Sequence, residues 1–435
     1  MPDRRSFIQQ SAALLGGLAL HTNVEAAFPG LAAGTSPRPA TLHDPGDEEA
    51  FWQQVRQAYA ASPTLINLNN GGVSPSPRAT AEALDHYTRM CNEAPSYYMW
   101  RILDQDREPL RMNLAALAGT SPEELAICRN TTEALNTIIF GLPLQKDDEV
   151  VVSTCDYPNM ANAWKQRSLR DGVKLVYADP VLPSADEDAI VRAYTDRFTA
   201  RTKLVHVPHV INWNGQIMPV RRIADEAHKR GIEVLVDGAH AFAVLDHKIT
   251  DTGCDYWGTS LHKFLCAPFG TGLMRIAREK IAKVWPLLSN DKPQSADIRK
   301  FETLGTRSFP AEMATGYSLD LHNLIGPARK QQRLHFLKSY WMDRVMDVPG
   351  IFFRTLNDPR YSCAIGTFGM EGKKATAIAE ALHTKWKIHT VAIERAGIPG
   401  VEAPYNHVRV TPNVYTTTQE LDRLVRLHVV PSFGH

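Results

Sequence analysis

Cysteine is scarce in this sequence, and the few cysteines stand far apart. The 435 residues include six, none of them in a Cys-x-x-Cys pair: Cys91, Cys128, Cys155, Cys254, Cys266 and Cys363. A disulfide framework needs cysteines at close, repeated spacing, and a zinc site needs cysteines or histidines in short pairs. The spacing therefore predicts neither a disulfide framework nor a metal site.

Long hydrophobic runs are missing as well. The apolar run Ser11–Leu20 is much shorter than the roughly 20 residues that a helix needs to cross a bilayer. We therefore expect no stable insertion into a membrane.

An excess of charge of either sign is also missing. Lysine and arginine together number 48 against 47 acidic residues, which leaves a formal net charge of +1. Proteins that bind nucleic acids or anionic membrane surfaces usually carry a basic patch. The composition therefore excludes nucleic acid as an expected partner and favours a small-molecule substrate.

The first 26 residues have the layout of a signal peptide. Arg4 and Arg5 precede Phe7, the apolar run follows, and small residues around Ala26 suit cleavage by signal peptidase. This arginine pair resembles a twin-arginine signal, an address that is read by an export receptor. We expect the twin-arginine machinery to export the folded protein to the periplasm. A chance arginine pair on an ordinary secretory signal is the alternative.

The chain before residue 120 is predicted to be mainly helical. Residues 27–64 are expected to form an N-terminal arm that ends in a helix over 48–60. The next stretch, 66–77, contains Asn-Gly-Gly and two Ser-Pro steps and is predicted as loop. Amphipathic spacing then predicts helices over 78–93 and 103–118.

Short β-rich runs alternate with helical stretches in the middle of the chain. Strands are predicted over 149–154, 174–177, 203–207 and 233–236, and helices between them over 160–170 and 220–230. Such alternation is typical of an α/β fold with a mostly parallel sheet covered on both faces. We assign residues 65–324 to this large domain and residues 325–435 to a smaller α+β domain.

Lys263 lies in the stretch 259–272, TSLHKFLCAPFGTG, whose pattern otherwise predicts a buried segment. Lysine is rarely buried unless it is paired or takes part in chemistry, and a desolvated amine becomes a nucleophile. Asp237 ends an earlier predicted strand, so its side chain and that of Lys263 are expected to enter one crevice. A pyridine aldehyde cofactor needs both groups, a lysine for the Schiff base and a carboxylate for the ring nitrogen. Taken alone, Asp237 can equally be a helix cap.

A second motif, CRNTTEALN, offers a place for the phosphate of such a cofactor. Asn130 has an acidic residue three positions later, so Thr131 and Thr132 are predicted at a helix N-terminus, where the dipole favours an anion. Ser260 and His262, next to the lysine, add further donors. Taken alone, the motif is only a helix start, and its combination with the lysine and aspartate makes it specific.

The segments 130–136, 237–241 and 260–263 together resemble the aminotransferase class V family of pyridoxal-phosphate enzymes. This fold type I family includes cysteine desulfurases, kynureninases and isopenicillin N epimerase-like proteins. The resemblance extends from about residue 65 to the C-terminus. It implies a mostly parallel seven-stranded sheet in the large domain, a smaller C-terminal domain, pyridoxal 5′-phosphate as the cofactor, and a homodimer.

The resemblance also implies a role for each matching residue. Lys263 would form the Schiff base and act as the base at the substrate α-carbon, Asp237 would pair with the pyridinium nitrogen, and Tyr157 would stack on the ring. The other implied contacts are with the phenolic oxygen (Asn212, His240), the phosphate (Thr131, Thr132, Ser260, His262), the phosphate of a neighbouring subunit (Thr306) and the substrate carboxylate (Arg409). A structural ion pair at a strand end is the alternative for the arginine.

One departure from the family concerns its desulfurases. These enzymes carry a nucleophilic cysteine on a loop before the substrate arginine, whereas residues 388–406 contain no cysteine. Persulfide chemistry is therefore disfavoured.

Export combined with a class V domain predicts an aminotransferase-like enzyme that acts on an amino acid or on a secreted, peptide-like metabolite with amino and carboxylate groups. The combination resembles a periplasmic enzyme that tailors the glutamate side chain of the siderophore pyoverdine. A C–S lyase or an epimerase of the same family is the alternative. A binding protein that keeps the fold without turnover is an alternative of another class.

Overall fold

The computed structural model describes residues 45–394 and 405–426. The predicted signal peptide, 1–26, lies outside the described residues, as do residues 27–44 of the predicted arm. Within the described ranges no helix is both long enough and apolar enough to cross a membrane.

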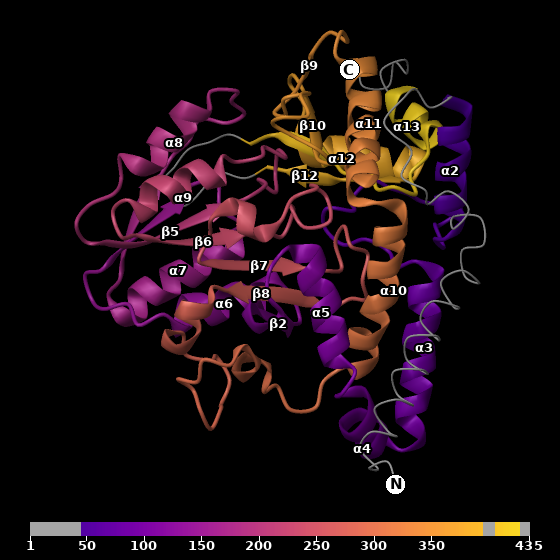
Figure 1. Ribbon diagram of the computed structural model, residues 1–435. Coiled ribbons are helices and arrows are strands. Elements are labelled where there is room, and N and C mark those ends of the chain that lie inside the picture. The colour runs from indigo at the N-terminus through magenta and orange to yellow at the C-terminus, as the bar shows by residue number, and fades with distance from the viewer. Residues whose placement is uncertain (1–44, 395–404, 427–435) are drawn as a thin grey trace.

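A seven-stranded sheet forms the centre of the larger part of the molecule, in the order β2-β8-β7-β6-β5-β3-β4 (Figure 1). Its strands are β2 (Leu125–Cys128), β3 (Glu149–Ser153), β4 (Lys174–Ala178), β5 (Thr202–Pro208), β6 (Glu233–Asp237), β7 (Tyr256–Ser260) and β8 (Gly272–Ile276). All pairs from β7 to β4 are parallel, and β8 runs antiparallel to both of its neighbours. The prediction of a mostly parallel seven-stranded sheet is confirmed.

Side chains alternate between the two faces of this sheet, and helices cover both faces. In β3, Val151 packs into the core that includes α8 and α9, whereas Val150 and Val152 pack into the core that includes α6 and α7. These helices are α6 (Thr131–Gly141), α7 (Pro158–Asp171), α8 (Glu187–Thr195) and α9 (Val220–His228). Burial on both faces explains why inner strands carry short apolar runs, such as Val150–Val152 of β3, in the sequence.

Three long helices lie beside the β2 edge of the sheet: α3 (Arg78–Glu93), α5 (Arg107–Ala118) and α10 (Phe309–Ile325) (Figure 1). The prediction of one helix over 103–118 was wrong at its start, because a turn at 104–106 separates α5 from the short α4 (Pro95–Tyr97) and a π-helix, η2 (Tyr98–Leu103). The predicted helix 48–60 is α2 (Pro45–Gln57), three residues earlier than expected.

The smaller domain contains a four-stranded antiparallel sheet in the order β12-β13-β10-β9. Its elements are β9 (Ile351–Phe352), β10 (Gly366–Met370), β12 (Val391–Ile393), β13 (His407–Val410), α11 (Pro327–Val345), α12 (Ala375–Trp386) and α13 (Thr418–Val425). Leu337 and Trp341 of α11 pack in its core with Phe368 and Val408. An ion pair of 3.0 Å between Arg56 Nη1 and Glu420 Oε2 links the helix α2 to this domain.

The stretch 66–77, predicted as loop throughout, begins with a short strand. β1 (Ile66–Asn67) pairs in parallel with β11 (Ile388–His389). Ile66 and Leu68 are buried in the core of the smaller domain. Two residues are too short a run to show a period in the sequence, and their pairing partner lies more than 300 residues away, so local pattern did not indicate it. The predicted domain boundaries stay predictions.

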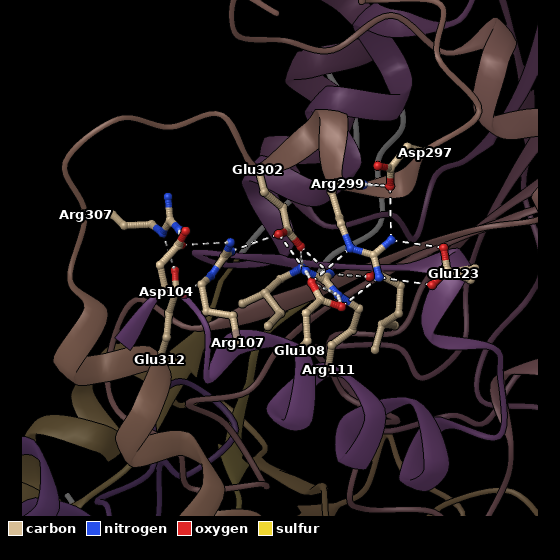
Figure 2. A network of polar contacts seen from close by, with 12 residues as sticks. Asp104, Arg107, Glu108, Arg111, Glu123, Asp297, Arg299, Glu302, Arg307 and Glu312 are labelled. Atoms are coloured by element: carbon tan, nitrogen blue, oxygen red, sulfur yellow. Dashed lines mark hydrogen bonds and ion pairs between the residues drawn. The ribbon is translucent and has the colours of Figure 1, made fainter. Parts of the chain in front are cut away.

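A network of buried charges ties the segment before α10 to the body of the large domain (Figure 2). Glu302, at the end of η6 (Ile298–Glu302), accepts from Arg107 Nη2 at 2.9 Å and from Arg111 Nη1 at 2.5 Å. Arg107 Nε also donates to Glu312 of α10 at 2.6 Å, and Arg307 Nε lies 3.1 Å from the same carboxylate. The network fixes both ends of the exposed segment 303–306. The remaining helical turns are η3 (Pro122–Glu124), η4 (Ile249–Thr252) and η5 (Arg278–Lys283).

Candidate active site

A cavity of about 260 Å³ lies at the carboxyl ends of β5, β6 and β7, where parallel sheets bind ligands. Its lining includes ten of the predicted site residues: Thr131, Thr132, Tyr157, Asn212, Asp237, His240, Ser260, His262, Lys263 and Arg409. The other residues that line it are Gly71, Gly72, Asn130, Met160, Pro208, Val210 and Ala239. The fold therefore brings together segments from residue 71 to residue 409.

Asp237 is the last residue of β6, and its buried carboxylate lines the cavity. Its Oδ1 accepts the Ala239 N–H at 2.9 Å. A Cβ at Gly238 would lie 2.0 Å from the Trp257 ring, so the turn after β6 requires glycine. Burial raises the pKa of Asp237, while the Ala239 N–H and the Lys263 cation act in the opposite direction. A cation in this cavity therefore stabilises the charged carboxylate.

Lys263 lies just beyond β7, the neighbour of β6 in the sheet. Its Nζ is 3.0 Å from His240 Nε2. Burial lowers the pKa of Lys263 to about 8, with Asp237 acting to raise it and Arg409 acting to lower it further. At pH 7 about a tenth of this amine is neutral, and hence nucleophilic, which is far more than for an exposed lysine of ordinary pKa.

The helix α6 points its N-terminus at the cavity. Asn130 is the N-cap, since its Oδ1 accepts the Glu133 N–H at 2.9 Å, and the predicted helix start is confirmed. Thr131 N donates to Ser260 Oγ at 2.9 Å, and the two hydroxyls lie 2.7 Å apart. These contacts fix the hydroxyls of α6 and of the β7 end side by side, where the helix dipole favours an anion.

Two histidines of the cavity carry buried nitrogens, His240 Nδ1 and His262 Nδ1, for which the described residues provide no hydrogen-bond partner. Burial lowers the pKa of both rings, and the Lys263 cation lowers it further. Both rings are therefore neutral, and each keeps one nitrogen for a ligand in the cavity. Buried polar atoms without partners are uncommon in native proteins and call for an explanation.

Arg409 enters the cavity from β13 of the smaller domain. Its Nη1 donates to Asn212 O at 2.8 Å and its Nη2 to Asn69 Oδ1 at 2.9 Å. Its buried Nε has no hydrogen-bond partner in the part of the chain that the structure describes. Among the described residues it forms no ion pair with a carboxylate, which leaves its charge uncompensated. Burial lowers the pKa of Arg409 to about 10, so the guanidinium stays charged at neutral pH.

Tyr157 is the N-cap of α7, and its side chain is 41% exposed. Together with Asn212 it lines both the first cavity and a neighbouring one of about 250 Å³. In the second cavity the rings of Trp213 and Tyr405 lie 4.1 Å apart between centroids, at 34°. Ile393 of β12 adds an aliphatic wall. A cavity with aromatic and aliphatic walls, which Asp156 and Glu394 also line, therefore adjoins the lysine-bearing one.

Thr306 does not line either cavity in the single chain. It is exposed within the segment 303–306, which the network around Glu302 holds at both ends. Its predicted contact with the phosphate of a neighbouring subunit stays a prediction.

Some residues of the cavity were missed from the sequence. Gly71 and Gly72 follow β1 and line the cavity, and a Cβ at Gly71 would lie 3.1 Å from Thr411. The Asn-Gly-Gly step indicated a turn, but nothing in the sequence joined that turn to the lysine. Asn130 was recognised only as a cap, although it also lines the cavity.

The donor set fits pyridoxal phosphate. The cavity combines an amine of lowered pKa, a buried carboxylate at the end of the next strand, a helix N-terminus with hydroxyls, and imidazole nitrogens without partners. Such a set suits a ligand with an aldehyde, a ring nitrogen and a phosphate. Fold and site together define a fold type I pyridoxal-phosphate enzyme.

Comparison with known proteins gives the family. The family model of aminotransferase class-V matches residues 66–424. Isopenicillin N epimerase of Streptomyces clavuligerus is 29% identical over 393 residues, which cover 86% of this chain and 97% of that protein. A probable cysteine desulfurase of Halalkalibacterium halodurans is 27% identical over 339 residues, covering 73% of this chain and 80% of that protein.

Solved structures agree with the fold. The cysteine desulfurase CsdA from Escherichia coli has a TM-score of 0.75 at 20% identity, covering 89% of this chain and 98% of that one. A C-DES mutant with glycine covalently linked to the PLP cofactor has a TM-score of 0.75 at 18% identity, covering 86% and 98%. The chain belongs to the aminotransferase class V family, and it is a pyridoxal-phosphate-dependent enzyme.

Proposed function

We propose that this enzyme is exported to the periplasm and acts on the amino group of an amino-acid unit within a secreted metabolite, as an aminotransferase-like tailoring enzyme. The observation that carries the proposal is the shared wall between the lysine-bearing cavity and the aromatic cavity, formed by Tyr157 and Asn212. A free amino acid needs only the first cavity. The second offers room for the rest of a larger molecule.

The residues around Lys263 supply the proton transfers. Bound pyridoxal phosphate would withdraw electrons from the substrate carbon that carries the amino group. The Lys263 amine, with its pKa lowered to about 8, accepts a proton from that carbon and, as the ammonium group, then donates a proton in the next step. Neutral His240, 3.0 Å from Nζ, orients the amine without adding a competing charge.

Arg409 is the proposed site for a substrate carboxylate. Its guanidinium is buried and charged, its neighbours Asn212 and Asn69 are neutral, and it lines the cavity. A carboxylate would give it the ion pair that it lacks within the described residues. The fork of guanidinium donors fixes the orientation of a carboxylate.

Epimerisation is a second candidate reaction. The relatives from Streptomyces clavuligerus and Amycolatopsis lactamdurans, at 29% and 27% identity, are isopenicillin N epimerases. Their names describe action on an amino-acid-containing metabolite, and epimerisation requires the same proton removal by the lysine. The two reactions diverge at the return of the proton, and amino transfer in addition needs water to release the oxo product and an acceptor for the nitrogen.

Desulfurase chemistry through an enzyme thiol fits the chain poorly. Of the six cysteines five are buried and Cys128 is half-buried. Burial raises the pKa of Cys155 to about 11 and that of Cys363 to about 12, which suppresses thiolate formation. A solved structure with this fold is that of the cystine C–S lyase C-DES in complex with its reaction product, cysteine persulfide. C–S cleavage is therefore an alternative reaction for this enzyme.

The export part of the proposal rests on Arg4 and Arg5 and the apolar run after them. For an enzyme in the periplasm, we propose the glutamate side chain of pyoverdine as the substrate. Replacing both arginines by lysine keeps the positive charge but removes the arginine pair that the export receptor recognises. Active enzyme should then stay in the cytoplasm. Unchanged periplasmic activity of the double variant would mean that an ordinary secretory signal suffices.

We further propose a homodimer in which the segment 303–306 of each subunit completes the site of the other with Thr306. The buried network around Glu302 supports this, because it holds an exposed segment in one conformation. Sedimentation at micromolar concentration measures the dimer. A fully active monomer would refute the shared site.

The reaction is tested by incubating the holoenzyme, with a 2-oxo acid as amino acceptor, with L-glutamate, with a γ-L-glutamyl anilide and with a pyoverdine precursor in D₂O. We expect the larger substrates to be preferred and amino nitrogen to be transferred, leaving an oxo product. Deuterium at the α-carbon with the amino group retained would indicate epimerisation instead. No preference for the larger compounds would contradict the role of the second cavity.

A further inference from the structure

The turn that follows Lys263 has an unusual backbone conformation. The Cys266 N–H donates to Lys263 O at 3.1 Å and closes the turn. Cys266 itself has a φ of 61°, in the left-handed region that residues with side chains seldom adopt. Such a conformation persists only where the surrounding structure holds it.

Buried polar groups from three separate segments hold this turn. Lys330 Nζ donates to Phe264 O, and Ser318 Oγ of α10 donates to Cys266 O at 2.9 Å. Asn413, which follows β13, donates from Nδ2 to Cys266 Sγ at 3.4 Å. Elements of both domains therefore hold the backbone next to Lys263 in place.

Lys330 is the ionisable amine of this set. It lies in α11, is 2% exposed, and also contacts His322 Nδ1 at 3.3 Å. No carboxylate among the described residues pairs with it, and burial lowers its pKa. An amine buried without a counter-charge is costly. Lys330 nevertheless occupies this position, with its Nζ on the carbonyl of the residue after Lys263.

We propose that Lys330 is a positioning residue for Lys263. By donating to Phe264 O, it fixes the turn from which the Lys263 side chain reaches the cavity. Its helix also contributes Leu337 and Trp341 to the core of the smaller domain, so the same contact links the lysine-bearing turn to that domain. The inference rests on the proposed role of Lys263 as the lysine that binds the cofactor.

Lys338 provides a matched control on the same helix. It is fully buried and donates to Ser362 Oγ at 2.5 Å, and burial lowers its pKa to about 8. Ser362 lies in the segment before β10. Replacing Lys330 or Lys338 by Met removes a buried amine from the same helix, but among the described residues only Lys330 donates to the turn.

The test uses full-length apoprotein of the wild type, K330M, K330R and K338M. Hydrogen–deuterium exchange of the peptide that contains residues 264–268 reports on the turn without cofactor. We expect roughly tenfold faster exchange in K330M, as for the loss of one buried hydrogen bond, and no change in K338M. K330R, which keeps a charged donor, should restore part of the protection.

A second readout is the rate of covalent uptake of added pyridoxal phosphate, followed by visible absorbance. We expect it to fall roughly tenfold in K330M and to stay at the wild-type value in K338M, since a small misplacement of a reacting group slows its reaction strongly. Unchanged exchange in K330M, or faster exchange with unchanged uptake, would overturn the inference. Absence of uptake in the wild type would refute the role of Lys263 instead.

Discussion

Lys263 Nζ and His240 Nε2 lie 3.0 Å apart, at the ends of two neighbouring parallel strands. His240 follows β6 and Lys263 follows β7. Because burial and the adjacent cation hold the pKa of His240 well below its usual range, the ring is neutral and its nitrogen can accept from the amine. The lysine is thus oriented by a group that does not compete with it for charge.

The first prediction concerns the protonation of Lys263 in the apoprotein. Its pKa of about 8 implies that acetylation by trace acetic anhydride rises up to about pH 8 and then levels off. A lysine of ordinary pKa should continue to gain reactivity to about pH 10. Peptide mapping by mass spectrometry follows Lys263 and the other lysines in one sample.

Two substitutions should move this pKa in opposite directions. Asp237→Asn removes a negative charge that raises the pKa of Lys263, so the midpoint should fall below about 8. Arg409→Met removes a positive charge that lowers it, so the midpoint should rise. Shifts of the same sign in both variants would contradict the arrangement of charges.

The second prediction concerns Asp237 in the holoenzyme. Asp237→Asn removes the negative charge proposed to keep the ring nitrogen protonated, while Lys263 remains free to bind the cofactor. We expect turnover to fall roughly 10²- to 10³-fold, as for other losses of a fixed charge in an active site. Borohydride trapping at the wild-type level is the control that the cofactor is still bound. If the variant kept full turnover, the role of Asp237 would be limited to capping the following turn.

The third prediction concerns Arg409. Arg409→Met should raise KM for a carboxylate-bearing substrate roughly 10- to 100-fold, the effect of losing a charged hydrogen-bonded pair. A substrate analogue that lacks the carboxylate should react equally slowly with both enzymes. Steady-state kinetics with the acid and its amide separates the two cases, and an equal effect on acid and amide would exclude carboxylate binding.

The fourth prediction concerns the buried charge network of Figure 2. Glu302→Ala would leave Arg107 and Arg111 buried without their shared carboxylate. We expect the free energy of unfolding to fall by about 3–5 kcal/mol. Asp85→Ala, which removes an exposed pair with Arg89, is the control and should change it by less than about 0.5 kcal/mol. Chemical denaturation measures both, and similar effects would contradict the role of the network.

The parts of the fold that repeat a local pattern could be predicted from the sequence. The strand 149–153 contains the apolar run Val150–Val152 because the sheet is buried on both faces, and this pattern is local. The strand β1 is different, since its two residues are defined only by their pairing with Ile388 and His389. The break before Arg107 was also missed, because its cause includes ion pairs with Glu302 and Glu312 far along the chain.

The site divides in the same way. Lys263, Asp237 and the Thr131 helix start could be found because each stands at the end of a predicted element and matches a motif. Neither Gly71 nor Lys330 matches a motif that indicates a role at the site. Gly71 reaches the cavity through the pairing of β1, and Lys330 reaches the turn through the packing of α11. Only the tertiary structure brings these residues to the lysine.

The central claim is that Lys263 binds the cofactor covalently. The most direct measurement is borohydride reduction of the holoenzyme, followed by peptide mapping, in the wild type and in Lys263→Ala. We expect the pyridoxyl group on the peptide that contains Lys263, no covalent label in the variant, and an unchanged circular dichroism spectrum, because the side chain faces a cavity. A pyridoxyl group trapped on any other lysine of the wild-type protein would contradict the account.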